Sequence, residues 1–304
     1  MRRFWPLVMF IMIFCIVWLL ADNAQKPLST VKNYQRIITL SPSLTETVFA
    51  LGLGDHVVAV TDYCDYPAQA QALPSVGSYT NTSIEAITRL QPDLVIMLNG
   101  QQQRQQQLEQ LGIKTLVLDN STIADIKETI QRIADLTGRQ NEADKLLTSI
   151  QAQIDYVHNK VRGLVPVRTL VGIAHYVNSD QLDTVYIAGQ HDFYNELLEL
   201  AGGVNVYTDT TIKVPSVSAE GIIRMNPDAI IDIFPEQKDH QSDMKQVIKQ
   251  WQSLRNVNAV KQQRIYIIEH DYASIPGPRI FKLLPEMAQL LHPELDWQDH
   301  QLND

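Results

Sequence analysis

The sequence predicts an α/β protein of two similar lobes, each with a parallel sheet, joined by one long helix. Strand-like apolar runs alternate with helix-like patterns over residues 35–138 and again over residues 166–304. Between these blocks, residues 139–165 show a single helical apolar stripe. The segment "IEAITRLQPDLVI" (84–96) also returns as "AEGIIRMNPDAII" (219–231). Alternating strands and helices are typical of parallel sheets covered by helices, so we expect two Rossmann-like lobes.

The first lobe is predicted from short apolar runs, each followed by an amphipathic segment. Strands are expected at residues 36–40, 57–60, 94–98 and 115–118. Helices are expected at residues 43–54, 84–90 and 101–112, and from residue 123 onward. The helix at 101–112 is rich in glutamine, which indicates a solvated helical face.

The connecting helix is the longest periodic segment of the chain. Apolar residues recur every three or four positions from Ala143 to Val161, which predicts about 22 helical residues and a length of roughly 33 Å. Gly163 and Pro166 end it. In the second lobe, strands are expected at 168–174, 229–234 and 264–268. Helices are expected at 192–203, 219–225 and 241–255, and after Pro278.

The N-terminus predicts export. Arg2 and Arg3 precede an uninterrupted apolar run from Phe4 to Ala21, and polar residues follow at once. A charged segment before an apolar one is typical of a signal peptide, while a run of this length is also able to span a bilayer. Residues 1–24 are therefore expected to be either cleaved or kept as an inner-membrane anchor. Both alternatives place the rest of the chain outside the cytoplasm, in the periplasm.

Composition and motifs exclude several function classes. The net charge is −9, and it becomes −11 without Arg2 and Arg3, so a nucleic-acid partner is not expected. The chain contains no G-x-S-x-G, H-E-x-x-H or P-loop motif, and we expect no enzyme activity and no cofactor. A receptor for a bare metal ion stays an alternative, and an exported enzyme is a weaker one. Such a metal site needs three or four converging ligands, whereas the candidate histidines are scattered at His56, His158, His175, His191, His240 and His270.

The repeated segment places one glutamate at the same point of each lobe. Ser83 and Ser218 are expected to cap the following helix, with Glu85 and Glu220 in its first turn. Stabilising a helix start is the simpler explanation of each glutamate alone. Repetition adds a second one, since two equivalent acids on one surface could dock a partner that presents two basic sites. A shorter likeness, "ETVFALG" (46–52) with "ELLELAG" (196–202), indicates that the lobes share their first helix too.

Several of these segments together carry a family resemblance. "RIITLSPSLTETVFALG", "TDYCDYPAQA" and the two repeated segments resemble the periplasmic substrate-binding proteins of bacterial ABC importers for cobalamin, haem and ferric siderophores. The likeness covers residues 35–290 and is closest to the cobalamin-binding branch. It implies a ligand cleft between the lobes and a monomer that captures a corrinoid, haem or ferric chelate in that cleft. It also implies that Glu85 and Glu220 pair with arginines of a dimeric membrane permease.

Candidate ligand-binding residues lie on loops between predicted elements. Tyr63, Tyr66 and Tyr79 each offer a flat apolar face and one hydroxyl, which suits a flat macrocycle, although tyrosines also pack at the edge of a lobe. The resemblance matches Tyr63 and Tyr79 to cleft aromatics, the second being tryptophan in the cobalamin-binding branch. It also matches Val214 to another tryptophan and Asp271 to a cleft acid. Two aromatic positions thus depart from the cobalamin pattern.

The stretch from residue 174 to 194 is a second source of cleft residues. His175, Tyr176, His191 and Asp192 lie in it, and an imidazole or phenolate is able to ligate iron or cobalt. A loop histidine is also often just solvated or hydrogen-bonded. Arg279 is expected either to pair with an anionic group of the ligand or to support the start of the last helix.

Overall fold

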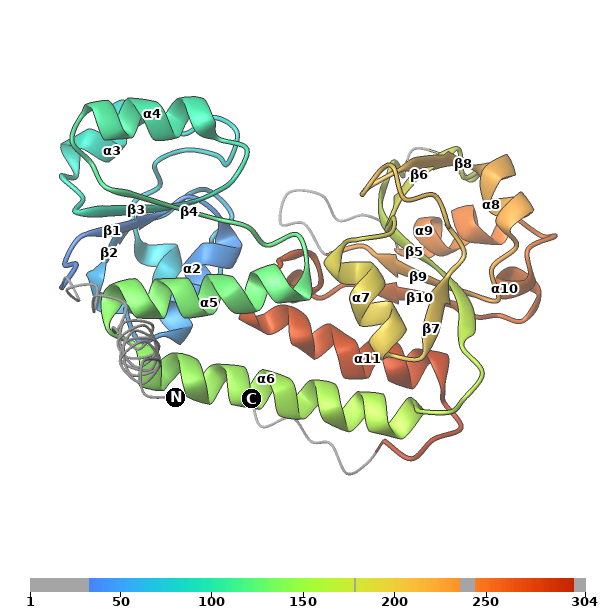
Figure 1. The fold of residues 1–304 in the computed structure, drawn as a ribbon. Helices are drawn as coiled ribbons and strands as arrows, with labels where there is room; N and C mark the ends of the chain where they lie inside the picture. Colours follow the sequence, from blue (N-terminus) through green and yellow to red (C-terminus); the bar gives the residue numbers. More distant parts are fainter. Residues whose placement is uncertain (1–32, 178, 236–243, 298–304) are drawn as a thin grey trace, which may run out of the picture.

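The computed structural model of the chain describes residues 33–177, 179–235 and 244–297, so the expected leader, residues 1–24, lies outside the described residues. Figure 1 shows two lobes side by side with one long helix running beneath both. Within the described part, no helix combines the length and the apolar character needed to cross a membrane.

The first lobe is built on a four-stranded parallel sheet in the order β2-β1-β3-β4. Its strands are β1 (Ile37–Thr39), β2 (Val57–Ala59), β3 (Leu94–Leu98) and β4 (Thr115–Leu118). Its α-helices are α2 (Pro42–Ala50), α3 (Ile84–Arg89), α4 (Gln102–Gln110) and α5 (Ile123–Thr137), with 3-10 turns η1 (Gly54–His56) and η2 (Ala68–Ala72). These elements agree with the predicted ones to within a few residues. The strands are apolar because helices cover the sheet on both sides.

The second lobe has a six-stranded sheet in the order β10-β9-β5-β6-β8, with β7 paired to β5. Its strands are β5 (Val167–His175), β6 (Thr184–Ile187), β7 (Gly203–Asn205), β8 (Ser216–Ser218), β9 (Ala229–Ile233) and β10 (Ile265–Ile268). The expectation of a parallel sheet was wrong in part here, because β6 runs antiparallel to both β5 and β8. β5, β9 and β10 are parallel, as expected, and β7, which was not predicted, also runs parallel to β5.

The helices of the second lobe follow the predicted order, with one short helix, α10 (Asn258–Lys261), that was not predicted. They are α7 (Phe193–Leu200), α8 (Ala219–Met225), α9 (Met244–Gln252), α10 and α11 (Leu283–Leu291), with 3-10 turns η3 (Asp271–Ser274) and η4 (Pro278–Lys282). Helix α8 begins at the cap Ser218, whose hydroxyl accepts from the N–H of Gly221 at 3.3 Å. Ser83 caps α3 in the same way, accepting from Ala86 at 3.1 Å. Both predicted caps are therefore confirmed.

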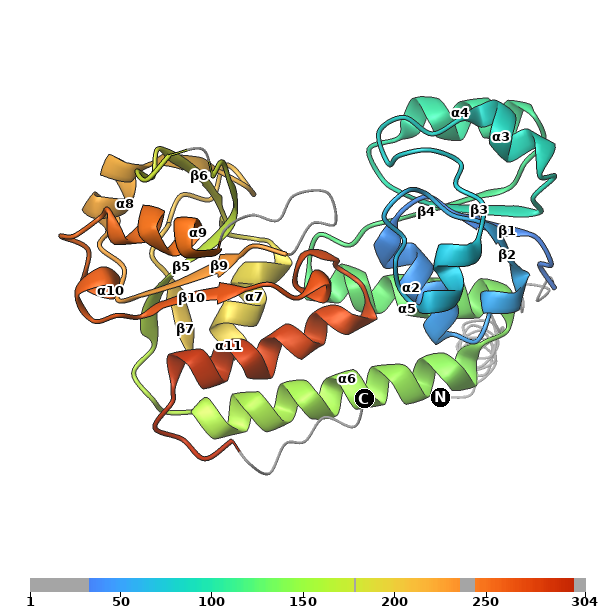
Figure 2. The same ribbon diagram turned by 180° about the vertical axis from the view of Figure 1, so that it is seen from behind.

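Helix α6 (Gln140–Val161) has the 22 residues predicted for the connecting helix. The two opposite views show α6 beneath both lobes, with α11 running above it beneath the second lobe (Figure 1, Figure 2). A single apolar cluster includes buried residues of α2, α5, α6, α7 and α11. Because interiors of this kind are close-packed, this shared core restricts how far the two lobes move apart.

Candidate functional site

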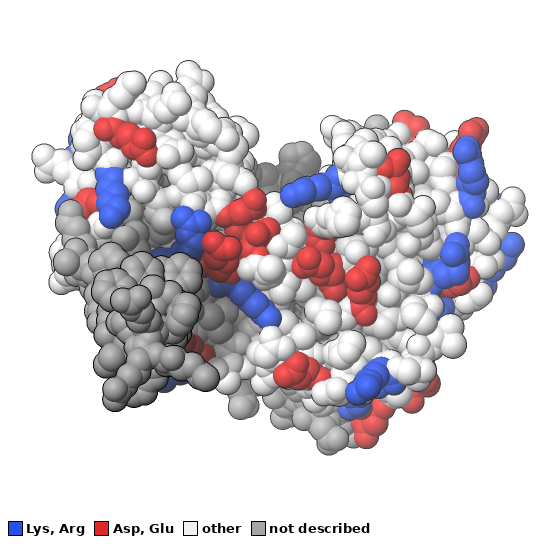
Figure 3. Space-filling model, viewed as in Figure 1, with Lys and Arg blue, Asp and Glu red and all other residues white. Residues whose placement is uncertain are grey.

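The two sheets direct the carboxyl ends of their parallel strands toward the same region between the lobes. Tyr66 follows β2 and Arg279 follows β10, and the guanidinium carbon lies 3.8 Å from the centre of the tyrosine ring. Asn120 follows β4, and its amide nitrogen donates to the carbonyl oxygen of Pro276 at 2.9 Å. In open α/β sheets, ligands bind outside the carboxyl ends of the strands. Figure 3 shows the surface hollowed between the lobes on the side away from α6.

A buried ion pair between Arg279 and Glu46 lies at the bottom of this region and forms its floor. Arg279 Nη2 lies 2.5 Å from Oε1 of Glu46, which belongs to α2 of the first lobe. The two side chains are only 13% and 2% exposed. The same guanidinium donates to both carboxylate oxygens of Asp271, at 2.7 and 3.2 Å. Arg279 thus joins the lobes and orients Asp271, whose own side chain stays half exposed.

The electrostatics of this group follow from burial and from the guanidinium. Burial raises the pKa of Glu46, and the hydrogen bond and charge of Arg279 only partly offset this. Burial alone would raise the pKa of Asp271 too. The hydrogen bonds and the charge of Arg279 outweigh burial, however, and hold this pKa below its usual value. Burial would lower the pKa of Arg279, but its two carboxylate partners raise it. Arg279 therefore stays charged and largely neutralised by protein groups, rather than free for an anionic ligand.

The repeated first helices both contact the opposite lobe. Glu46 of α2 binds Arg279, and its counterpart Glu196 of α7 accepts the backbone N–H of Ile123 through Oε2 at 2.6 Å. Next to the second contact, the N–H of Phe193 donates to the carbonyl oxygen of Ser121 at 2.9 Å. Each lobe thus uses a glutamate of its first helix to fix the other lobe.

The candidate tyrosines lie on loops at the carboxyl ends of the strands. Tyr63 and Tyr66 follow β2, and Tyr79 lies beside the turn after β3, where its carbonyl oxygen accepts from Arg104 Nη1 at 3.3 Å. Tyr63 is 75% exposed and has a positive φ of 65°. A bulky residue rarely adopts that conformation, and such strain clusters at ligand sites. Tyr66 is partly engaged already, since one ring face carries Arg279.

On the second lobe, Tyr176 and Val214 are exposed and His175 is not. Tyr176 directly follows β5 and is 78% exposed. His175 Nε2 lies 2.8 Å from Oδ2 of Asp232, and neither side chain is exposed. Trp251 donates to the same oxygen at 2.7 Å. The structure therefore places His175 inside the second lobe, in a position that does not suit ligation of a chelate between the lobes.

Gly172 explains how the buried carboxylate fits beside β5. A Cβ at this position would lie 2.7 Å from Oδ1 of Asp232.

The other candidate histidine, His191, is exposed and has a positive φ of 63°. Among the residues that the structure describes, no three His, Cys, Asp or Glu side chains converge as a metal site requires.

Comparison with known proteins decides the family. Residues 37–272 match the family described as "Periplasmic binding protein". The chain belongs to the periplasmic binding protein family. An uncharacterized ABC transporter substrate-binding lipoprotein of Bacillus subtilis, YvrC, is 26% identical over 278 residues, which cover 90% of this chain and 85% of that protein.

Two further relatives connect the family to particular ligands. The vitamin B12-binding protein of Pectobacterium atrosepticum is 29% identical over 204 residues, covering 65% of this chain and 71% of that protein. A solved structure described as a possible iron-binding (periplasmic solute-binding) protein of Staphylococcus epidermidis is 29% identical, with a TM-score of 0.70, and covers 86% of this chain and 100% of that chain. The periplasmic binding protein described here is thus a substrate-binding protein and not an enzyme, and such proteins of ABC importers work with a membrane permease.

Sequence reasoning missed the inter-lobe roles of Glu46 and Asn120 in this binding protein. Asn120 is buried and donates both to Ser43 Oγ at 3.0 Å and to Pro276. Each contact joins residues far apart in the chain, and Asn120 belongs to no local motif. The likeness of Glu46 to Glu196 was visible in the sequence, and it was the one signal that could have indicated a shared role.

Asp192 makes the stability of the binding protein depend on pH. Burial raises its pKa to about 6, against hydrogen bonds from the N–H groups of Asn195, Tyr194 and Gly189. The pKa of Asp192 is higher in the folded protein than in the unfolded chain. Protonated Asp192 therefore contributes to the unfolding free energy in full below pH ~4, and this contribution is lost as the pH rises through ~6. Between pH 4 and pH 7.5 this linkage lowers the unfolding free energy by about 2.4 kcal/mol, and we expect Asp192→Asn to abolish that decrease. Denaturant unfolding at both pH values measures this, and identical pH profiles for the two proteins would contradict it.

Proposed function

We propose that this protein is the extracytoplasmic solute-binding component of an ABC importer and captures a metal chelate between its lobes. The observation that carries the proposal is the convergence of both sets of strand carboxyl ends on one region, where Tyr66 of the first lobe stacks on Arg279 of the second. Cobalamin is the first candidate ligand, and a ferric siderophore or haem comes next. The vitamin B12-binding relative and the possible iron-binding relative support this class of ligands.

The side chains at this region favour a flat, conjugated ligand. Tyr63, Tyr79 and Tyr176 offer exposed rings, and Val214 adds an exposed apolar surface. Aromatic rings bind flat macrocycles through stacking and apolar contact, with a hydroxyl left for orientation. Asp271 supplies a carboxylate for a polar group of the ligand, because Arg279 keeps this side chain ionised.

Docking on the permease is assigned to Glu85 and Glu220. Helices α3 and α8, which carry them, lie on the upper parts of the two lobes, on the side opposite α6 (Figure 1). Glu85 is 84% exposed and pairs with Arg89 of its own helix, at 2.7 Å. An exposed ion pair of this kind is worth at most about 1 kcal/mol. An arginine of the permease is therefore able to replace Arg89 at little cost.

Ligand titration tests the proposed function. The purified protein is titrated with cyanocobalamin, haemin, a ferric catecholate siderophore and zinc chloride, and quenching of its tyrosine and tryptophan fluorescence is followed. We expect one chelate to bind with one-to-one stoichiometry at micromolar Kd or tighter, which corresponds to about −8 kcal/mol or better. Binding of zinc alone, or of none of the four, would overturn the proposal.

Removal of either exposed ring in the first lobe should weaken capture. Tyr63→Ala and Tyr79→Ala are each expected to raise the Kd for the bound chelate about tenfold, since each removes one stacking face. Leu111→Ala is the matched control, because Leu111 is exposed but follows α4 at the end far from the strand carboxyl ends. A Kd unchanged in both tyrosine variants, with the control also unchanged, would place the ligand elsewhere.

A further inference from the structure

Helices α3 and α8 end in the same way. Each is followed by a residue with a left-handed backbone, Gln91 with φ 47° and Asn226 with φ 46°. A Pro-Asp pair and a buried strand come next in both lobes. Neither helix is long, with six and seven residues. Helices this short are unstable in isolation, so contacts with the rest of each lobe must fix their positions.

In the first lobe an arginine at the start of β1 holds the end of α3. Arg36 Nη2 and Nε donate to the carbonyl oxygen of Leu90 at 2.6 and 3.0 Å, and Nε also donates to that of Gln91 at 3.2 Å. Asp93 then accepts the backbone N–H groups of Gln35 and Arg36 at 2.8 and 3.0 Å. The guanidinium thus occupies the carbonyl end of the helix, where a positive charge is favoured.

The second lobe repeats this arrangement with Arg168. Its Nη2 donates to the carbonyl oxygen of Met225, the last residue of α8, at 2.9 Å, and its Nε lies 3.9 Å from Asp228. The N–H of Asp228 donates to the carbonyl oxygen of Arg168 at 2.7 Å, as that of Asp93 does to Arg36 at 3.0 Å. Both arginines are exposed, so their hydrogen bonds to helix carbonyls are not a by-product of burial.

We propose that Arg36 and Arg168 are positioning residues for permease docking, one in each lobe. Each arginine fixes the carbonyl end of a short helix whose other end carries a docking glutamate. A serine cap fixes that other end, so both ends of the helix are held. This inference rests on the proposed function. It adds two residues that support docking without touching the permease themselves.

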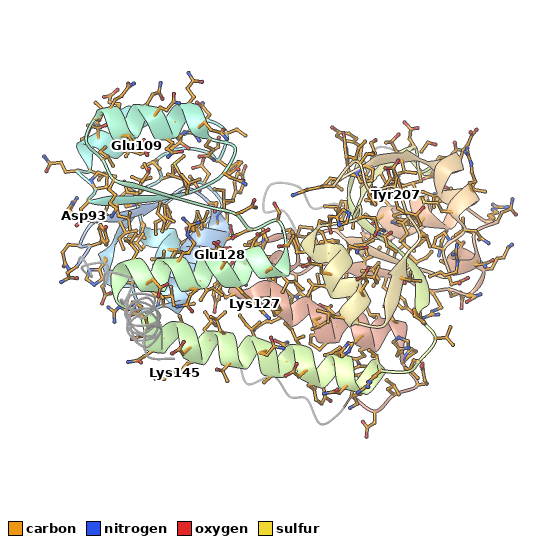
Figure 4. All side chains as sticks on the ribbon, in the orientation of Figure 1. Asp93, Glu109, Lys127, Glu128, Lys145 and Tyr207 are labelled. Atoms are coloured by element: carbon orange, nitrogen blue, oxygen red, sulfur yellow. The ribbon has the colours of Figure 1, made fainter. Side chains whose placement is uncertain are left out.

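The location of the arginines separates docking from ligand capture. Figure 4 labels Asp93 at the outer end of the first lobe, away from the second lobe. Arg36 binds the backbone next to this residue, at the amino ends of the strands. The ligand region lies at the opposite, carboxyl ends. A change at Arg36 or Arg168 therefore reaches the docking helix without touching the floor formed by Arg279 and Glu46.

The test compares Arg36→Ala, Arg168→Ala and their combination in the full chain with its permease in proteoliposomes. Two quantities are measured: the Kd for the chelate identified by titration, and the protein concentration that half-maximally stimulates ATP hydrolysis. We expect the half-maximal concentration to rise about fivefold in each single variant and more in the double variant, since each loses charge-assisted hydrogen bonds. The chelate Kd should not change. Arg255→Ala, at an exposed arginine of the second lobe, is the control.

Two further measurements distinguish positioning from a general loss of stability. Hydrogen exchange should accelerate at the backbone amides of residues 84–91 in Arg36→Ala and of residues 219–226 in Arg168→Ala, while amides of β3 and β9 stay protected. Arg36→Lys should rescue Arg36→Ala only partly, since an ammonium lacks the second fixed donor direction. If the arginine variants stimulate ATP hydrolysis normally while charge reversal at Glu85 and Glu220 abolishes it, positioning is wrong and docking stands. If neither set has an effect, the proposed docking itself fails.

Discussion

Reversal of both docking charges, Glu85→Lys with Glu220→Lys, is expected to reduce uptake by about 100-fold or more. Like charges facing each other across an interface cost several kcal/mol, and both contacts would become repulsive at once. Ligand affinity should stay at the value of the unchanged protein, because both glutamates are exposed and neither is among the proposed ligand-binding residues. Uptake of the labelled chelate by cells that carry each version, together with ligand titration of each purified protein, measures both effects.

A matched charge reversal controls for the change in net charge. Glu128→Lys with Asp144→Lys alters the charge by the same amount at exposed positions on α5 and α6. Figure 4 places Glu128 on α5, and Lys145, the neighbour of Asp144, on α6. This variant should take up ligand normally. Normal uptake by the Glu85/Glu220 variant, or an equal loss in both, would refute docking through the two glutamates.

Loss of the buried inter-lobe pair is the second large effect. Arg279→Ala leaves Glu46 buried, with no guanidinium to compensate its charge, and breaking a buried pair in this way costs about 3 kcal/mol or more. Tyr66 also loses the cation stacked on its ring, and Asp271 loses both of its charge-assisted hydrogen bonds. We therefore expect both the unfolding free energy and the affinity for the chelate to fall, as measured by denaturant unfolding and by titration.

A double-mutant cycle shows whether the effect belongs to the pair. Glu46→Ala with Arg279→Ala should cost at least about 1 kcal/mol less than the sum of the two single variants, because no unpaired charge is left. Arg132→Ala is the control, since Arg132 is exposed and lies 3.9 Å from the exposed Glu128. It should change stability by less than about 0.5 kcal/mol. Additive single effects would mean that Glu46 and Arg279 do not act together.

The parts of the fold that could be predicted are those with a local pattern. The apolar run at 94–98 is β3, and the seven spaced apolar residues of the connecting segment give all of α6. β6, β7 and β8 were missed because they are only three or four residues long and carry polar or small residues such as Thr184, Ser216 and Ser218. Their antiparallel pairing depends on partners from other parts of the chain, which no local pattern reveals.

The site was harder to predict for the same reason. Loop composition and the repeat were enough to select the exposed tyrosines and Glu85 and Glu220 as candidates, and their binding and docking roles stay predictions. The pairing of Glu46 with Arg279 joins residues 233 positions apart, and its burial is visible only in the folded chain. His175 had a suitable type and position in the sequence, but the end of β5 turns it inward to Asp232. Arg36 and Arg168 are offset by 132 rather than 135 residues, so the strict repeat did not include them.

The visible absorbance spectrum of the protein purified from its own host tests the central claim most directly. Capture of a metal chelate between the lobes predicts the bands of a corrinoid, a haem or a ferric catecholate, in a one-to-one ratio to protein. These bands should be lost when Tyr63→Ala and Tyr79→Ala are combined and kept in Leu111→Ala. A colourless protein that binds none of the three chelates when they are supplied would contradict the account.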